Sequence, residues 1–427
     1  MNSENNAKRN NGNNRRNNYH NKNQYKNRNN NGKNSSRNNR GNGKKYFNSN
    51  SKRNSNRINV NGKKYNKPIQ KTKPSIKISF LGGLNEIGKN ITLFECEDEI
   101  IVLDCGMAFP DGEMLGVDLV IPDFTYLIQN KDRVKAILLT HGHEDHIGGL
   151  PYLLTEMSAP IYGTPLTLGL VENKLKEHSL LQSTELITVQ AGDKVKLGKM
   201  TAEFIHVNHS IPDAVAIALH TPAGTIVHTG DFKIDCTPIS GGMIDLNRFA
   251  RLGGEGVLAL MSDSTNASRE GYTPTEHTVY DSFKNLFQKA EKERIIIATF
   301  ASNVNRVQQI INCAKKFGRK VAFSGRSMIN YMKVANELGY IDIPENIIID
   351  IDQIPQYTPQ EIVLVTTGSQ GEPMSALTRM AFSDHRKITV GTGDFIIISA
   401  NPIPGNEKSV GNVVDELLKK GCRVVYE

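Results

Sequence analysis

Three histidines and two carboxylates lie within six residues of the sequence, in the string His141-Gly142-His143-Glu144-Asp145-His146. Ordinary core packing does not explain them, because burying polar groups without partners is expensive. A bound metal does. One turn can aim His141 and His143 at one ion and Asp145 and His146 at another. Imidazole nitrogen with carboxylate oxygen suits zinc or manganese, and zinc is the default. The alternative is a solvated turn with incidental histidines.

Two further residues with metal-ligating side chains, His209 and Asp231, each follow a predicted strand. Taken alone, either would more often be structural than a ligand. Beside the first cluster we interpret both as ligands, since an aspartate can bridge two ions and leave room for a hydroxide between them. The neighbouring His206 and His228 fit strand positions, and we interpret them as structural.

Two turns in the second half of the chain are weaker candidates, for phosphate. Ser302 and Asn303 stand before a predicted helix at Val304–Phe317, and the turn at Thr367–Glu372 contains two glycines. Helix amides or closely approaching backbone can hold an anion there. Simple helix capping is the preferred interpretation of either turn on its own. The helix also carries Arg306, which we interpret as part of a charged solvent face.

An acidic stretch begins at Phe109–Glu113 and continues past Gly116 to Asp118 and Asp123. Its oxygen-bearing groups predict a second hard-cation site, for calcium or another divalent ion, at Gly116 and Asp118. A solvated loop explains the stretch equally well.

The elements that must position these residues divide the chain into two folded regions. Over residues 75–275, short apolar runs separated by Gly and Pro indicate sheet-rich structure with some helix. Over 276–427, strands alternate with helices, which indicates βαβ units on a largely parallel sheet. The predicted strands are Ile76–Leu81, Ile100–Leu103, Val134–Leu139, Phe204–Val207, Thr225–His228, Ile295–Thr299, Lys320–Phe323 and Ile362–Thr366, and the predicted helices are Pro165–Glu177, Val304–Phe317, Ser327–Leu338 and Met374–Phe382.

A basic arm precedes both regions. Residues 1–73 contain 20 Lys+Arg, 26 Asn and one acidic residue, a net charge of +19, whereas the remaining 354 residues carry −11 within a total of +8. Apolar residues are too few in the arm to offset the entropy of ordering, so we expect disorder. Such an arm could bind RNA, bind ribosomes or another acidic partner, or aid solubility.

Localisation is predicted from what the chain lacks and from its cysteines. The arm has no apolar h-region and the chain no long apolar run, which disfavours secretion and membrane insertion. The five cysteines are widely spaced without a CxxC pair. This pattern favours a reducing, cytoplasmic location over a disulfide framework.

The candidate ligands, in their order along the chain, resemble the motifs of the metallo-β-lactamase superfamily. Asp104, in Val102-Leu103-Asp104-Cys105-Gly106, precedes them and is part of this resemblance. More narrowly, the chain from about residue 75 onward resembles ribonuclease J of the β-CASP group. The strings that carry this resemblance are Leu81-Gly82-Gly83-Leu84-Asn85-Glu86-Ile87-Gly88-Lys89-Asn90, Ser262-Asp263-Ser264-Thr265-Asn266, Phe300-Ala301-Ser302-Asn303 and Thr367-Gly368-Ser369-Gln370-Gly371-Glu372-Pro373.

The resemblance implies an α/β architecture, in which a two-sheet αββα metallo-β-lactamase domain (75–275) carries an inserted β-CASP domain (276–427), with RNA bound between them. By analogy, two zinc ions are held in each subunit, one by His141, His143 and His209 and the other by Asp145 and His146, with Asp231 as the bridge. Asp104 would contact one of the metal-binding side chains, not the metal, and so fix the orientation of that side chain. Asp263 matches the first signature acid of the group. Phe300, Ala301, Ser302 and Asn303 are implied to contact RNA, with Ser302 at the sugar-phosphate backbone of the RNA.

The implied activity is RNA cleavage, both endonucleolytic and 5′ to 3′ from monophosphorylated ends, in RNA maturation and decay. Two ions can stabilise the attacking and leaving oxygens together. The predicted catalytic residues are Asp145, Asp231 and His209, around a hydroxide that attacks the phosphorus in line and leaves a 5′ phosphate.

The sequence departs from the family pattern toward its end. Two expected histidine motifs, one for the 5′ phosphate of the RNA and one completing the second metal's ligands, do not occur. His385 lies in a polar run that is typical of surface. We therefore interpret the chain as a fragment of a longer product, whose full-length parent would be a homo-oligomer or part of an RNA-decay complex. The second zinc is then expected to bind more weakly.

Two other functions remain open. One is a metallo-hydrolase acting on a small thioester or lactam, although such an enzyme does not need the region from 276 onward. The other is a non-catalytic RNA-binding protein with a vestigial metal site.

Overall fold

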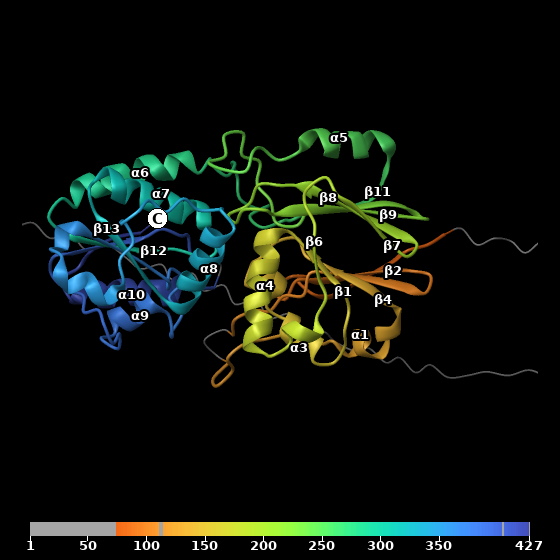
Figure 1. Ribbon diagram of the computed structural model, residues 1–427, viewed down its shortest axis with the longest axis horizontal. Coiled ribbons are helices and arrows are strands. Elements are labelled where there is room, and N and C mark those ends of the chain that lie inside the picture. The colour runs from red at the N-terminus through yellow and green to blue at the C-terminus, as the bar shows by residue number, and fades with distance from the viewer. Residues whose placement is uncertain (1–73, 111–113, 404, 427) are drawn as a thin grey trace, which may run out of the picture. The chain divides into compact units, whose positions relative to one another are not determined.

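Three β-sheets built from short apolar strands form the framework of the chain (Figure 1). The computed structural model describes residues 74–110, 114–403 and 405–426. The arm at 1–73 lies outside the described residues, and so does the part of the acidic stretch at 111–113. The statements below concern the described residues.

The first sheet has six strands in the order β1-β2-β3-β4-β5-β6. Strands β1 to β3 are antiparallel to one another, and the pairs from β3 to β6 are parallel. Their bounds are Lys77–Gly82 (β1), Ile91–Cys96 (β2), Glu99–Leu103 (β3), Val134–Leu138 (β4), Ile161–Gly163 (β5) and Leu186–Thr188 (β6). Parallel pairing places the ends of β3 and β4 at the same edge, where the histidine string begins.

The second sheet has five strands in the order β11-β10-β9-β8-β7, antiparallel except for the pair β10 and β11. The bounds are Lys194–Leu197 (β7), Met200–His206 (β8), Val215–Thr221 (β9), Gly224–His228 (β10) and Val257–Met261 (β11).

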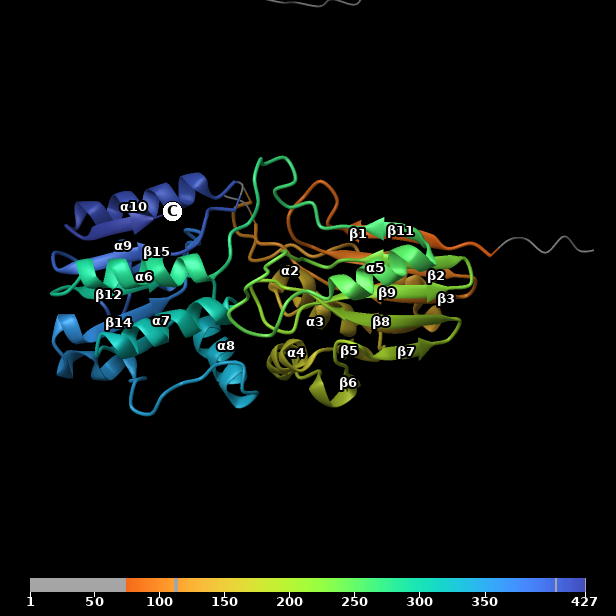
Figure 2. The same cartoon turned by 90° about the horizontal axis from the view of Figure 1, so that it is seen from above.

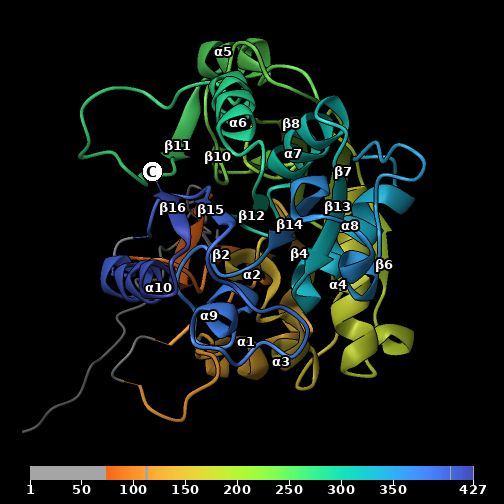
Figure 3. The ribbon, with the colours of Figure 1, turned by 90° about the vertical axis from the view of Figure 1, so that its left-hand side faces the viewer.

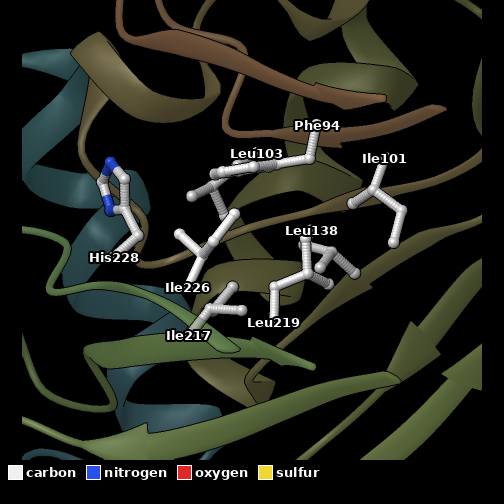
Figure 4. A pocket seen from close by; sticks show the side chains of 8 residues that line it. All are labelled: Phe94, Ile101, Leu103, Leu138, Ile217, Leu219, Ile226 and His228. Atoms are coloured by element: carbon white, nitrogen blue, oxygen red, sulfur yellow. The ribbon is translucent and has the colours of Figure 1, made fainter. Parts of the chain in front are cut away.

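These two sheets face each other with helices on both outer sides (Figure 1), and the view from above shows α5 over the strands of the second sheet (Figure 2). Between them lies a row of apolar side chains that includes Phe94, Leu138, Ile217 and Ile226, with His228 at one end (Figure 4). The space among these side chains is too small for a water molecule. It is therefore part of the apolar core and not a ligand site. The covering helices are Thr125–Gln129 (α1), Glu144–Ile147 (α2), Leu150–Leu154 (α3) and Pro165–Glu177 (α4) on the first sheet, and Leu246–Glu255 (α5) on the second. The predicted αββα arrangement is confirmed.

The third sheet has the order β13-β14-β12-β15-β16 and is parallel throughout, as predicted (Figure 3). Its strands are Arg294–Ala298 (β12), Lys320–Ser324 (β13), Ile362–Thr366 (β14), Asp394–Ile398 (β15) and Arg423–Tyr426 (β16). Its helices are His277–Lys289 (α6), Val304–Lys316 (α7), Arg326–Glu337 (α8), Ala376–Ala381 (α9) and Glu407–Lys419 (α10). Short 3₁₀ turns lie at Lys131–Arg133, Leu181–Ser183, Ile351–Gln356 and Pro359–Glu361.

Alternation along β12 explains how this sheet is covered on both faces. Ile295 and Ile297 face the apolar cluster that contains α6, α7 and α8, whereas Ile296 and Ala298 face the cluster that contains α9 and α10. Strands buried on both sides are typical of parallel sheets, and they explain the continuous apolar runs in this half of the sequence.

Arg306 corrects one prediction about this region. Its side chain does not belong to a solvent face, because only 15% of it is exposed and it forms an ion pair with Glu276 at 2.9 Å. It also donates to the Ser399 carbonyl at 2.9 Å. Arg306 thus ties α7 to the start of α6 and to the end of β15.

No described helix combines the length and the hydrophobicity that crossing a membrane requires.

Candidate metal centre

The six predicted metal ligands come together at one edge of the two facing sheets. The string from His141 to His146 follows β4 and leads into α2, whereas His209 follows β8 and Asp231 follows β10. Gly230 has φ of +57° and lies against Thr140. A glycine suits this position because the chain adopts the left-handed conformation and must pass close to the first sheet before Asp231.

Three ring nitrogens point at a common centre. The Nδ1 of His143 lies 3.0 Å from Nε2 of His141 and 3.2 Å from Nε2 of His209. Since Nδ1 of a ring carries at most one proton, hydrogen bonding can account for only one of these contacts. A tetrahedral ion with Zn–N bonds of about 2.0–2.1 Å separates its nitrogen ligands by roughly 3.3 Å. The spacing of the three rings therefore fits zinc.

A second group consists of His141, His146 and Asp231. Asp231 lies between the two groups, because Oδ1 is 3.4 Å from Nε2 of His146 and Oδ2 is 3.8 Å from Nε2 of His209. The predicted partner Asp145 is adjacent, with Oδ2 at 3.5 Å from Nε2 of His146. The described ligand atoms thus form two overlapping sets, which is the arrangement that a pair of ions requires.

Asp104 fixes the orientation of two of these rings. Its Oδ2 accepts a hydrogen bond from Nδ1 of His146 at 2.8 Å. It also accepts from the hydroxyl of Thr140 at 2.9 Å, and that hydroxyl lies 3.0 Å from Nδ1 of His141. Because the Thr140 hydrogen is directed at the carboxylate, its oxygen accepts from His141. Both rings therefore hold their proton on Nδ1 and leave Nε2 free for a metal.

The rings of His143 and His209 are neutral at neutral pH. Burial lowers the pKa of His143 to about 3 and that of His209 to about 4. Only a neutral imidazole has a lone pair to offer to a metal.

His146 shows the opposite effect. Burial alone would lower its pKa, but the nearby Asp145, Asp231 and Asp104 raise that pKa well above its usual value. These carboxylates require a positive charge beside them, which a proton on His146 or a bound cation would supply.

Three supporting residues were missed by reasoning from the sequence. Thr140 directly precedes the string, and its role as a link between Asp104 and His141 depends on the tertiary fold. Asn90 donates from its side chain to Oδ2 of Asp145 at 3.1 Å. Ser210 lies 3.4 Å from Nε2 of His143. Asn90 belongs to one of the strings that carry the family resemblance, and its place in the sequence gives no sign of a contact with Asp145.

The predicted RNA-contact turn lies between β12 and α7. Asn303 is buried and caps α7, where its side chain accepts from the backbone N–H of Arg306 at 3.0 Å. Phe300, Ala301 and Ser302 are half-buried. Among the described residues, the Ser302 hydroxyl has no side-chain hydrogen-bond partner. The capping interpretation thus holds for Asn303 and leaves Ser302 available to a ligand.

The remaining predicted residues are not members of the ligand clusters described above. Gly116 and Asp118 are exposed, and neither belongs to a cluster of three ligating side chains within the part of the chain that the structure describes. Asp263 accepts from the backbone N–H of Thr265 at 2.7 Å. The structural interpretation of His228 fits its geometry, since Nδ1 accepts from the backbone N–H of Gly230 at 3.0 Å.

Helix α8, which packs on the third sheet, contacts the loop that carries the first histidines. The hydroxyl of Tyr331 donates to the carbonyl of Gly142 at 3.0 Å, between His141 and His143. This buried hydrogen bond connects α8 to the backbone that positions both candidate ligands.

Comparison with known families gives two matches. Residues 84–251 match the model of the metallo-β-lactamase superfamily. Residues 292–417 match the model described as ribonuclease J, β-CASP domain.

Several curated relatives are similar over more than four-fifths of this chain. Ribonuclease J of Helicobacter pylori is 48% identical over 357 residues, covering 83% of this chain and 52% of the relative. Ribonuclease J of Synechocystis is 47% identical, covering 82% and 55%. Ribonuclease J2 of Bacillus subtilis is 43% identical, covering 84% and 64%. The chain thus spans about half to two-thirds of the length of these relatives.

One solved structure supports the fold. A protein of unknown function from Enterococcus faecalis superposes with a TM-score of 0.59 at 16% identity, over 83% of this chain and 87% of that one. At this identity the likeness concerns the fold alone.

Proposed function

The chain belongs to the ribonuclease J family, and on that premise we propose that it is a metal-dependent ribonuclease that hydrolyses phosphodiester bonds of RNA. The observation that carries this proposal is the convergence of four histidines and Asp231, with Asp145 beside His146, next to a β-CASP domain. The strands of the first two sheets end at Met261 and those of the third begin at Arg294, which supports domain limits of 75–275 and 276–427.

The proposed cofactor is a pair of zinc ions. His141, His143 and His209 would hold one ion, and Asp145 and His146 the other, with Asp231 shared between them. Bound there, the ions would supply Lewis-acid stabilisation of phosphate oxygens and a nucleophile at neutral pH. The overlap of the two ligand sets at His141 and the intermediate place of Asp231 support the shared arrangement.

The residues of the chain itself orient this chemistry. Asp104 and Thr140 keep the ring nitrogens Nε2 of His146 and His141 directed at the centre. Tyr331 holds the loop carbonyl between the first two ligands. The half-buried Ser302, at the start of α7, is proposed to donate to a backbone phosphate of the RNA, because its hydroxyl and the helix N-terminus both favour an anion.

The test combines metal content with cleavage. Purified chain should bind zinc, measured by mass spectrometry, and should cleave RNA only without chelator. His143→Ala should remove both properties, whereas His178→Ala changes an exposed histidine outside the cluster and should retain them. Parallel substrates with 5′-monophosphate or 5′-triphosphate ends test the proposed preference for monophosphate.

Full cleavage by His143→Ala would refute the assignment of the site. A zinc-loaded wild-type chain that binds RNA and leaves it intact would refute catalysis by this chain and favour the RNA-binding alternative.

A further inference from the structure

A second pocket, rich in positive charge, lies in the β-CASP domain away from the metal ligands. It has a volume of about 600 Å³ and opens where β13 ends and α8 begins. Helix α9 closes it on another side with Arg379, the segment after α9 adds His385 and Arg386, and Ile351 contributes from a 3₁₀ turn. A volume of this size is typical of sites for small organic ligands.

Among the residues that the structure describes, four cationic side chains and no carboxylate line this pocket: Arg326, Arg379, Arg386 and Lys387. Two of them are partly neutralised, since Arg379 pairs with Asp384 at 3.3 Å and Lys387 with Asp352 at 2.7 Å. Within the described residues, Arg326 and Arg386 have no ion-pair partner. The pocket therefore presents unbalanced positive charge.

The N-terminus of α8 adds backbone donors to the same place. The helix has 12 residues, and its N-cap is Gly325, which has no side chain to accept from the first N–H groups. These donors and the helix dipole favour an anion at this end of the helix.

The buried Ser324 is an independent indication of an anionic ligand. Its side chain is 97% buried in the pocket wall, where its oxygen lies 3.1 Å from Nε2 of His385. Nδ1 of His385 accepts from the backbone N–H of Ile388 at 3.0 Å. The proton of the neutral ring is then on Nε2, which donates to Ser324.

The hydroxyl hydrogen of Ser324 consequently needs an acceptor elsewhere. The described part of the chain offers none within hydrogen-bond distance. A buried donor without an acceptor is costly. A ligand oxygen in the pocket would satisfy it.

The rest of the lining is apolar. Phe323, Ile329 and Ile351 form part of the wall, and about half of the Ile329 side chain is exposed. Inorganic phosphate would leave this apolar surface in water, whereas a nucleotide can place its phosphate at the arginines and its base on the apolar wall.

We propose that this pocket binds a nucleotide, with the phosphate held by Arg326, Arg386, Ser324 and the amides of α8. The nucleotide is either free or a unit of an RNA strand. The inference goes beyond the proposed hydrolysis and does not depend on activity at the metal centre.

The experiment measures binding of two probes to the full chain. Adenosine 5′-monophosphate is titrated by calorimetry, with adenosine as the probe that lacks phosphate. A labelled RNA oligonucleotide with a 5′-hydroxyl is titrated by fluorescence anisotropy, with chelator present to prevent cleavage. The variants are Arg326→Gln and Arg386→Gln, which change exposed side chains and should leave the fold intact. Lys333→Gln removes a positive charge from an exposed position on the same helix and is the matched control.

Either arginine variant should weaken binding of the monophosphate by about tenfold or more, because a charge-assisted hydrogen bond contributes about 1.5–3 kcal/mol. Lys333→Gln should bind like the wild type, and adenosine should bind more weakly than its monophosphate. An effect on RNA without an effect on the monophosphate identifies the strand as the source, and the reverse identifies a free nucleotide.

Three results would overturn the proposal. These are a wild type that binds neither probe, arginine variants that equal the wild type for both probes, and loss of monophosphate binding in His143→Ala alone, which would locate the nucleotide at the metal centre. The last variant also separates this proposal from the ribonuclease function, since it should abolish cleavage and leave the basic pocket unchanged.

Discussion

Replacing Asp104 by Asn should weaken metal binding without disturbing the backbone. Asp104 has φ of +59°, a left-handed conformation that Asn adopts as readily as Asp. The substitution also preserves the size of a side chain that is 2% exposed. It therefore isolates the hydrogen bonds and the charge of the carboxylate.

The magnitude follows from the contacts of the two carboxylate oxygens. Oδ1 accepts from the backbone N–H of Thr140 at 2.8 Å, and Oδ2 accepts from His146 at 2.8 Å and from the Thr140 hydroxyl at 2.9 Å. An amide has only one oxygen, so in either orientation its NH₂ group faces a donor. Loss of one hydrogen bond to a charged group costs about 1.5–3 kcal/mol. We expect a loss of about 10- to 100-fold in metal affinity, as for other residues that orient ligands.

The assay is competition for zinc between the protein and a chromophoric chelator, with thermal unfolding of both chains as a check on folding. Asp98→Asn is the matched control, because Asp98 is exposed. Unchanged zinc affinity in a folded Asp104→Asn protein would refute the role of Asp104 in orienting His146 and His141. Equal losses in both variants would point to net charge as the cause.

Three further predictions concern Thr140, Glu203 and the basic arm. Thr140→Val removes the hydroxyl between Asp104 and the first histidine, and we expect about a fivefold loss of zinc affinity in the same competition assay, from one hydrogen bond of about 1 kcal/mol. Burial would raise the pKa of Glu203, but hydrogen bonds from Arg248 and two other residues lower it to about 2 from 4.5. The stabilisation is therefore complete above pH 4.5 and is lost as the pH falls toward 2. The difference in urea midpoint between wild type and Glu203→Gln should shrink over that range, and a constant difference would contradict the assignment. Deletion of residues 1–73 removes 19 net positive charges and should flatten the salt dependence of RNA binding; an equal slope in the shortened chain would exclude the arm from that role.

Three of the candidate metal ligands could be predicted because His141, His209 and Asp231 each stand a few residues after the end of a strand. An apolar run followed so closely by a histidine or an aspartate indicates both the strand and the polar edge where its end lies. Parallel or facing strands then bring these ends together. The strand-helix alternation after residue 276 likewise predicted a parallel sheet, because buried parallel strands have continuous apolar sequences.

The supporting contacts could not be predicted, because they join residues that are distant in sequence and have ordinary types. Asn90 and Asp145 are 55 residues apart, and Arg306 and Glu276 are 30 apart. A charged residue on a helix is more often solvated, so the sequence favoured a solvent face for Arg306. His385 lies in a polar run and still reaches Ser324, because the segment after α9 folds back on the end of β13.

Net charge is a poor guide to nucleic-acid binding in this chain, for a reason that the described contacts make clear. Residues 74–427 carry −11 overall, but several of these carboxylates are already paired, such as Glu203 with Arg248 and Glu276 with Arg306. Others, around His146, are the charges that a metal would balance. Within the described residues, the basic pocket holds two arginines that have no ion-pair partner, Arg326 and Arg386. Phosphate recognition therefore depends on which charges lack partners, and a local excess of this kind persists at salt concentrations that screen the long-range field of the whole chain.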